Sequence, residues 1–154
     1  MITLRFCTRW PYNPASWAIA RLSGSHWSHC FTIINGVAYE ATMLHGCRVV
    51  PVHVAMQGMT RYQDMEIPVP NMATAEGWGW EQQGKGYDYF GALGIPFLMS
   101  EDWGDWSRWW CSELCFMQLC MGGNYLLDQS MQKRVTPQDL YNCNYQKSPI
   151  VTLK

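Results

Sequence analysis

The sequence lacks the features that would mark a membrane, nucleic-acid-binding or secreted protein. It contains no stretch of about 20 consecutive apolar residues, as a membrane-spanning helix requires. It has no run of basic residues, and 11 Lys and Arg stand against 12 Asp and Glu, which disfavours phosphate binding. Residues 1–10 alternate like a strand and lack the apolar segment and cleavage site of a signal peptide. We therefore expect no membrane span, no nucleic-acid partner and synthesis in a cytoplasm.

The seven cysteines also lack the pattern of a disulfide or zinc protein. Their number is odd, and no paired CxxC motif is present. Free thiols, without a resident metal or cofactor, are the expectation. Three of the cysteines lie close in sequence, so a metal-binding or redox-sensing role stays open as an alternative; they are Cys111, Cys115 and Cys120.

The sequence does contain enough apolar side chain for one core. Of 154 residues, 48% are hydrophobic and 14% are aromatic, at a length typical of one domain. We find no internal repeat, low-complexity tract or linker. The expectation is a single domain over residues 1–154.

Local signals predict an antiparallel sheet. Asn35-Gly36 is a strong two-residue turn, and it joins the β-prone segments His29–Ile34 and Val37–Ala41 in a hairpin. Three further segments are expected to be strands, and the C-terminal tail could close the sheet. These segments are Ile2–Cys7, Cys47–Val54, Tyr62–Val69 and Ile150–Leu153.

Capping residues and glycines delimit the predicted helices. One runs from Asn71, as N-cap, to about Gln83, and a second runs from Cys111 to Met121 before Gly122-Gly123. Thr136-Pro137 opens a third that ends at Asn142, and a short helix is expected at 15–22. Residues 87–100 are predicted to form a broken helix or loop. Together with the strands, this pattern predicts an α+β fold.

The candidate chemistry begins at Cys111, which opens the second helix. Free backbone N–H groups and the helix dipole at that position favour a thiolate, so a pKa below the usual value is expected, and they can also face a substrate oxyanion. The competing interpretation is a cysteine that only packs in an apolar helix. A thiolate nucleophile needs a base, and the four histidines offer His29, which opens a rigid strand, and His26, which lies in a loop.

Glu40 is the candidate group to orient the His29 imidazole. If the turn has two residues, Ile34 pairs with Val37, and Glu40 lies across the hairpin, two positions along from His29. A carboxylate at that diagonal position can accept a hydrogen bond from the ring. The competing interpretation is a solvated strand glutamate.

These residues resemble a known family. Ser28-His29, Tyr39-Glu40-Ala41, Tyr87-Asp88, the segment 110–114 (WCSEL) and the segment 136–140 (TPQDL) are similar, in order and spacing, to the YiiX-like permuted papain-fold enzymes, relatives of the NlpC-type cell-wall hydrolases. The resemblance implies a small antiparallel sheet packed against helices, with the His-bearing strand before the Cys-bearing helix.

The resemblance also implies an activity. Cys111 would be the nucleophile, His29 the base and Glu40 the orienting residue of a thiol peptidase or amidase that forms a thioester intermediate. Tyr87 would line the substrate cleft. The implied substrate is a peptidoglycan peptide or a similar amide. Lipid acyl transfer or thioester cleavage is one alternative, and a virion-associated component of a phage tail, held by other tail proteins, is another.

Overall fold

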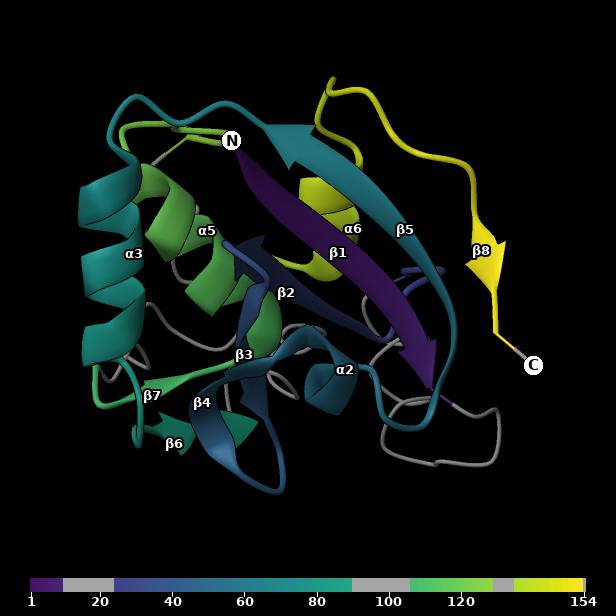
Figure 1. Cartoon of the computed structure of the whole chain (residues 1–154), viewed down its shortest axis with the longest axis horizontal. Coiled ribbons are helices and arrows are strands. Elements are labelled where there is room, and N and C mark those ends of the chain that lie inside the picture. Colours follow the sequence, from purple (N-terminus) through teal and green to yellow (C-terminus); the bar gives the residue numbers. More distant parts are fainter. Residues whose placement is uncertain (10–23, 90–105, 129–134, 154) are drawn as a thin grey trace.

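The structure, a computed structural model, describes residues 1–9, 24–89, 106–128 and 135–153. Its centre is a six-stranded antiparallel sheet in the order β4-β3-β2-β1-β5-β8 (Figure 1). The strands are β1 (Ile2–Arg9), β2 (His29–Ile34), β3 (Val37–Thr42), β4 (Gly46–Pro51), β5 (Met59–Ile67) and β8 (Val151–Thr152). With a few helices packed on this sheet, the α+β class predicted from the sequence is confirmed.

The β2–β3 hairpin forms as its turn residues predict. Asn35 and Gly36 both have positive φ, 51° and 78°, which is the conformation that a two-residue turn between twisted strands requires. Ile34 pairs with Val37 and the next two residue pairs follow in register. The predicted register is confirmed, and it fixes which side chains of the two strands share a face of the sheet.

Within the described residues, four helices accompany the sheet: α2 (Val52–Ala55), α3 (Met72–Glu81), α5 (Cys111–Met121) and α6 (Pro137–Tyr141). The caps act as predicted, since Asn71 accepts a hydrogen bond from the Thr74 N–H and Thr136 forms a capping box with Asp139. Gly123, with φ 86°, follows the end of α5. Local capping chemistry therefore located the starts of α3 and α6 and the end of α5, whereas α2 was not predicted.

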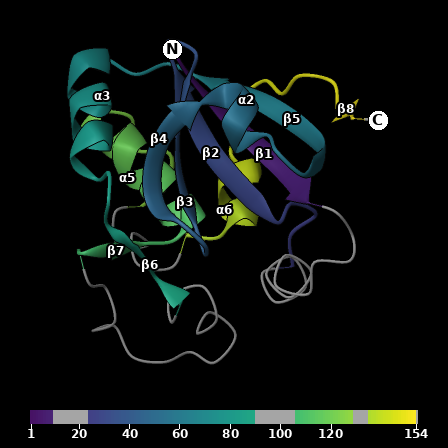
Figure 2. The same ribbon diagram turned by 60° about the horizontal axis from the view of Figure 1, so that its bottom comes forward.

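Helix α5 is the buried element of the fold. All ten residues from Cys111 to Cys120 are buried, so the helix is enclosed on every side rather than amphipathic. It packs against β2 and β3 of the sheet and against α3 and α6 (Figure 2). Alternate residues of the strands, including Leu4, Phe6 and Cys30, contact the core cluster that contains α5.

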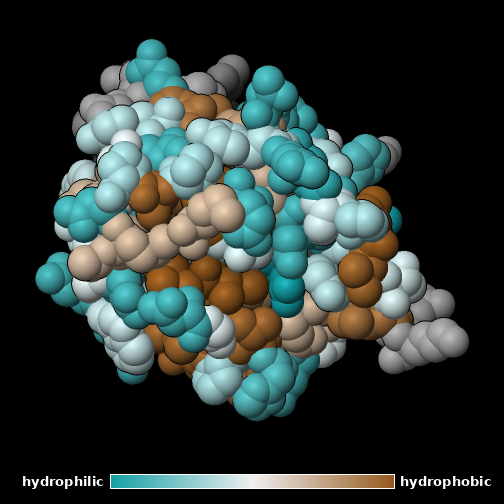
Figure 3. Space-filling view, turned by 45° about the horizontal axis from the view of Figure 1, so that its top comes forward, coloured by the Kyte–Doolittle hydropathy of each residue, from teal (hydrophilic) through white to brown (hydrophobic). Residues whose placement is uncertain are grey.

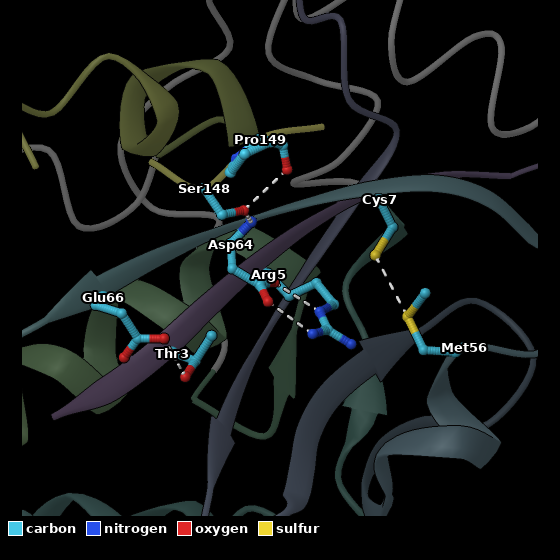
Figure 4. A network of polar contacts seen from close by, with 8 residues as sticks. All are labelled: Thr3, Arg5, Cys7, Met56, Asp64, Glu66, Ser148 and Pro149. Carbon is cyan, nitrogen blue, oxygen red and sulfur yellow. Dashed lines mark hydrogen bonds and ion pairs between the residues drawn. The ribbon is translucent and has the colours of Figure 1, made fainter. Parts of the chain in front are cut away.

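The opposite face of the sheet carries a smaller core under α2. Phe31, Ala38 and Cys7 pack there with Ala55 and Met59. The same face bears a polar network between β1 and β5, in which Arg5 binds Asp64 (Figure 4). Direct antiparallel partners lie on one face, so Arg5, Asp64 and Phe31 share this face with α2.

Two strand predictions were wrong at their ends. Cys47–Val54 was predicted as one strand, but β4 ends at Pro51 and helix α2 begins at Val52. Proline has no N–H for the ladder and suits the position before a helix, which explains the break. The strand predicted at Tyr62–Val69 begins earlier, at Met59, and ends at Ile67. The helix predicted at 15–22 and most of the segment 87–100 lie outside the described residues.

A second, two-stranded sheet was not predicted. Strand β6 (Gly86–Tyr87) pairs in parallel with β7 (Arg108–Trp109), which brings residue 87 beside the residues that precede Cys111. A parallel pair of two residues each has no local sequence signal, because its partners are distant in the chain.

The edge strands of the main sheet are β4 and the two-residue β8. Strand β8 pairs with β5, as expected for the C-terminal tail. Ile150, Val151 and Leu153, in and beside β8, are exposed. Figure 3 shows brown, apolar patches on the face of the molecule that it draws. Among the helices in the described ranges, none combines the length and apolar character needed to cross a bilayer.

Candidate functional site

Cys111 is the first residue of α5, as predicted. Trp110 precedes it in an extended conformation and provides no side-chain cap, so the first N–H groups of the helix point out of its end beside the Cys111 thiol. The residue is only 1% exposed. A helix N-terminus at this position can offer backbone N–H groups to an oxyanion next to Cys111.

The start of α5 is held by hydrogen bonds on both sides of Cys111. Ser112 Oγ donates to the Val135 carbonyl at 2.6 Å, and Trp109 Nε1 donates to Gln82 Oε1 at 3.0 Å. Lys85 Nζ donates to the same Gln82 oxygen at 2.6 Å. These contacts join the start of α5 to the residue before the N-cap of α6 and to the turn after α3, and they hold the backbone that carries the thiol.

His29 opens β2 and faces Cys111. Its side chain is 12% exposed, and the Cys111 side chain lies near enough to help raise the His29 pKa. The ring also packs 5.8 Å from the ring of Phe31, two residues along the same strand. His29 therefore lies on a rigid element, as expected for a base that must keep its orientation.

The predicted contact of His29 with Glu40 is confirmed. His29 Nε2 lies 3.0 Å from Glu40 Oε2, and the Glu40 side chain is 0% exposed. Because Nε2 binds the carboxylate, Nδ1 is the ring nitrogen left for Cys111. The imidazole thus lies between a thiol and a carboxylate, which is the arrangement of a nucleophile, base and orienting group.

Arg48 is a fourth member of the site, and sequence reasoning missed it. It pairs directly with Glu40 across the β3–β4 ladder, and both Nε and Nη2 lie 2.7 Å from Glu40 Oε1. In the sequence, the signal for Arg48 would have been an arginine on the strand next to Glu40, directly opposite it in the ladder. It could not be used because the length of the turn between β3 and β4 was not predicted.

The charged groups set the pKa of His29. Burial acts to lower it, but hydrogen bonds to Cys111 and Glu40 and their negative charges outweigh burial and raise the pKa to about 9. For Glu40, burial acts to raise the pKa, but the His29 hydrogen bond, the His29 charge and Arg48 together lower it. At neutral pH the site therefore contains a carboxylate between an imidazolium and a guanidinium.

The expected lowering of the Cys111 pKa was wrong. A hydrogen bond with the Cys30 thiol and burial raise the pKa well above its ordinary value, and His29 opposes them only in part. Cys30 follows His29 on β2 and also contacts Cys115, one turn further along α5. The position at the start of a helix favours a thiolate at Cys111, but the neighbouring thiols favour the protonated form.

Tyr87 lies beside the site. It is 5% exposed and packs in a cluster with Trp109, Trp110 and Leu114. Burial raises its pKa well above the ordinary value, and the charges of Cys111 and Cys30 act in the same direction. The structure thus brings Tyr87 close to Cys111, and its expected role in a cleft stays a prediction.

The remaining histidines lie apart from this group. His26, His45 and His53 are all exposed. The rival base, His26, uses its backbone carbonyl to accept hydrogen bonds from Thr8 and Arg61. Of the two candidate bases, His29 is the one in contact with Cys111 and Glu40.

The cysteines are free thiols in the structure. Within the part of the chain that the structure describes, three or more His, Cys, Asp or Glu side chains nowhere converge as metal ligands. Cys111 and Cys115 lie in the main core, and Cys115 is fully buried there. The structure therefore gives no support to the metal-sensing alternative.

Comparison with known proteins adds no family to this geometry: no family model matches the chain, and no curated protein matches it.

Proposed function

We propose that this chain is a cysteine hydrolase with a permuted papain-like fold, in which Cys111 is the nucleophile and His29 its base. The observation that carries the proposal is the position of the His29 ring, in contact with Cys111 and with the buried Glu40 carboxylate. A cysteine that served only as packing would have no need of a histidine held by a buried ion pair, because burying such charges is costly.

The chemistry follows from the order of the contacts. The reactive form is a Cys111 thiolate beside a His29 imidazolium, which the protonated pair reaches by losing one proton to solvent, and Glu40 stabilises the imidazolium. The thiolate attacks the carbonyl carbon of an amide, and the oxyanion is bound by the free N–H groups at the start of α5. His29 gives its proton to the leaving amine as the C–N bond breaks, which leaves a thioester on Cys111.

A water molecule completes the reaction. His29, now neutral, removes a proton from water, which attacks the thioester and releases the carboxylic acid. The proton returns to the Cys111 sulfur, so the site is restored without a cofactor. The same thioester could transfer its acyl group to another nucleophile, and that partition separates an acyltransferase from a hydrolase.

We propose a peptide of the peptidoglycan type, or a similar amide, as substrate. The resemblance of the His29, Glu40, Tyr87 and Cys111 motifs to the NlpC-type hydrolases supports this choice. The aromatic wall made by Tyr87, Trp109 and Trp110 beside the thiol is compatible with it.

The test is turnover of peptidoglycan peptide fragments, followed by mass spectrometry of products and of the protein. The proposal expects cleaved peptide and a thioester adduct on Cys111. Both should be absent in Cys111→Ala and His29→Ala, whereas His26→Ala should match the unaltered chain. Cleavage that survives in Cys111→Ala would contradict the assignment. Acyl esters and thioesters, run beside the peptides, would reveal a lipid acyltransferase or thioesterase instead.

A further inference from the structure

The way Arg48 binds Glu40 differs from a simple ion pair. Both guanidinium nitrogens that contact the carboxylate, Nε and Nη2, bind one oxygen, Oε1, at 2.7 Å. The other oxygen, Oε2, is left for His29 at 3.0 Å. Each carboxylate oxygen therefore has its own partner, and the plane of the carboxylate is fixed from two sides.

Burial makes this division of partners important. The Glu40 side chain is 0% exposed, while those of Arg48 and His29 are 22% and 12% exposed. If Arg48 were absent, His29 would be the remaining cation in contact with Glu40. Release of the His29 proton would then leave a buried carboxylate without a counter-charge, which is strongly unfavourable.

Each element around His29 contributes a titratable or charged group. Cys111 faces its ring from α5, Glu40 from β3, and Arg48 acts on it from β4 through Glu40. Cys7 of β1 lies near enough to feel the Glu40 charge. Of these groups, Arg48 is the cation that remains charged over the whole range in which His29 titrates.

We propose that Arg48 is a positioning residue of the site. It holds Oε1 of Glu40, which keeps Oε2 on His29, and it compensates the Glu40 charge whenever His29 gives up its proton. His29 can then cycle between its two protonation states without exposing an unpaired buried charge. The consequence for turnover rests on the proposed function, but the effect on the His29 charge does not.

The experiment measures the titration of His29 by NMR of the ring in protein labelled at histidine, in a Cys111→Ala background. This background removes the thiol, one of the groups that raise the His29 pKa, and it removes any dependence on catalysis. Arg48→Met takes away the cation with little change in size. Arg5→Met is the matched control, because Arg5 binds the carboxylate of Asp64 on the same face of the sheet.

The expected result is an upward shift of the His29 pKa by about 1 unit in Arg48→Met, because a nearby cation no longer opposes the proton. Arg5→Met should leave the titration unchanged. A His29 pKa that stays constant or falls in Arg48→Met would overturn the proposal. If Arg48→Met does not fold, Arg48→Gln replaces it, with the same expected direction.

The two proposals can fail separately. Absence of hydrolysis by the unaltered chain, with the upward shift present, would refute the proposed function and keep the role of Arg48 as the counter-charge. Normal hydrolysis with an unshifted titration would do the reverse.

Discussion

Two arginine–carboxylate pairs lie on the same face of the sheet, Arg5 with Asp64 and Arg48 with Glu40. At one, Arg5 Nε and Nη2 bind the two oxygens of Asp64 separately, both at 2.7 Å, and Figure 4 shows this closed pair. At the other, the two contacting nitrogens of Arg48 share a single oxygen of Glu40. The first carboxylate is saturated by its arginine, whereas the second keeps one oxygen for His29.

The surroundings of the two pairs match this difference. Asp64 is 21% exposed, and its backbone joins Ser148 near the C-terminus, while Arg5 also packs over the ring of Tyr62. Glu40 is fully buried and contacts a residue that titrates. The Arg5–Asp64 pair, with both carboxylate oxygens bound to the arginine, links two strands. The Arg48–Glu40 pair leaves one carboxylate oxygen to interact with a third group, His29. An arginine paired with a carboxylate thus serves stability at one place and, in our proposal, chemistry at the other.

The largest expected effect is a loss of turnover at the Cys111 site that does not occur at the Arg5–Asp64 pair. Cys111→Ala should remove turnover by at least about 10³-fold, because no other group supplies the nucleophile. Circular dichroism should be unchanged, since a cysteine and an alanine differ little in size. Asp64→Asn, at the closed pair, should keep turnover within about twofold and lower the free energy of unfolding by about 2 kcal/mol, as loss of a charged hydrogen bond does. Equal loss of activity in both variants would erase the distinction.

Glu40→Gln should have the next largest effect. We expect kcat/KM to fall by about 10- to 100-fold, because a neutral amide holds the ring but stabilises the imidazolium less. The pKa of His29 should fall as well, since the Glu40 charge is among the causes that raise it. Steady-state kinetics over a pH range checks both. Glu66→Gln, on the edge of the closed network, is the matched control and should leave both values unchanged.

The pH dependence of thiol alkylation tests the protonation of Cys111 and His29. His29 has a pKa of about 9 and the Cys111 pKa is raised, so below pH 9 the two groups hold both protons. Alkylation needs the thiolate, and the Cys111 pKa is raised well above its ordinary value, so the rate at Cys111 should still be rising with pH at pH 9. Iodoacetamide labelling with peptide mapping measures this rate. A plateau already reached at pH 6 to 7 would mean that the thiolate is preformed.

The smallest expected effect concerns Cys30. Its hydrogen bond is the largest cause of the raised Cys111 pKa, so Cys30→Ala should lower that pKa and speed alkylation of Cys111 several-fold at pH 7.5. Cys120→Ala, further along the same helix, should leave the rate unchanged. Slower labelling in Cys30→Ala would show that Cys30 assists the thiolate.

The parts of the site that the sequence predicted are those set by short-range geometry. Asn35-Gly36 fixed the hairpin register, and the register placed Glu40 diagonally from His29. The end of α5 followed from the Gly122-Gly123 pair directly after Met121. In each case the determining residues lie within about one turn or one hairpin of their effect.

The parts that the sequence did not predict depend on contacts between distant segments. Arg48 reaches Glu40 only because a turn of unpredicted length joins β3 to β4, and Cys30 meets Cys111 only where α5 packs on β2. The helix dipole favoured a low thiol pKa, but burial beside a second thiol reverses it. The strand predicted to run past Pro51 ended there because the helix α2 could cover the small core under Ala55.

The sequence by itself determined the hairpin, the caps of α3 and α6, the end of α5 and the α+β class, because turn, capping and pairing preferences act between neighbouring residues. The tertiary structure alone decided which thiols surround Cys111, which arginine compensates Glu40 and how strongly His29 holds its proton. Those properties depend on burial and on charges brought together from separate strands and a helix, and neither is encoded within any single segment.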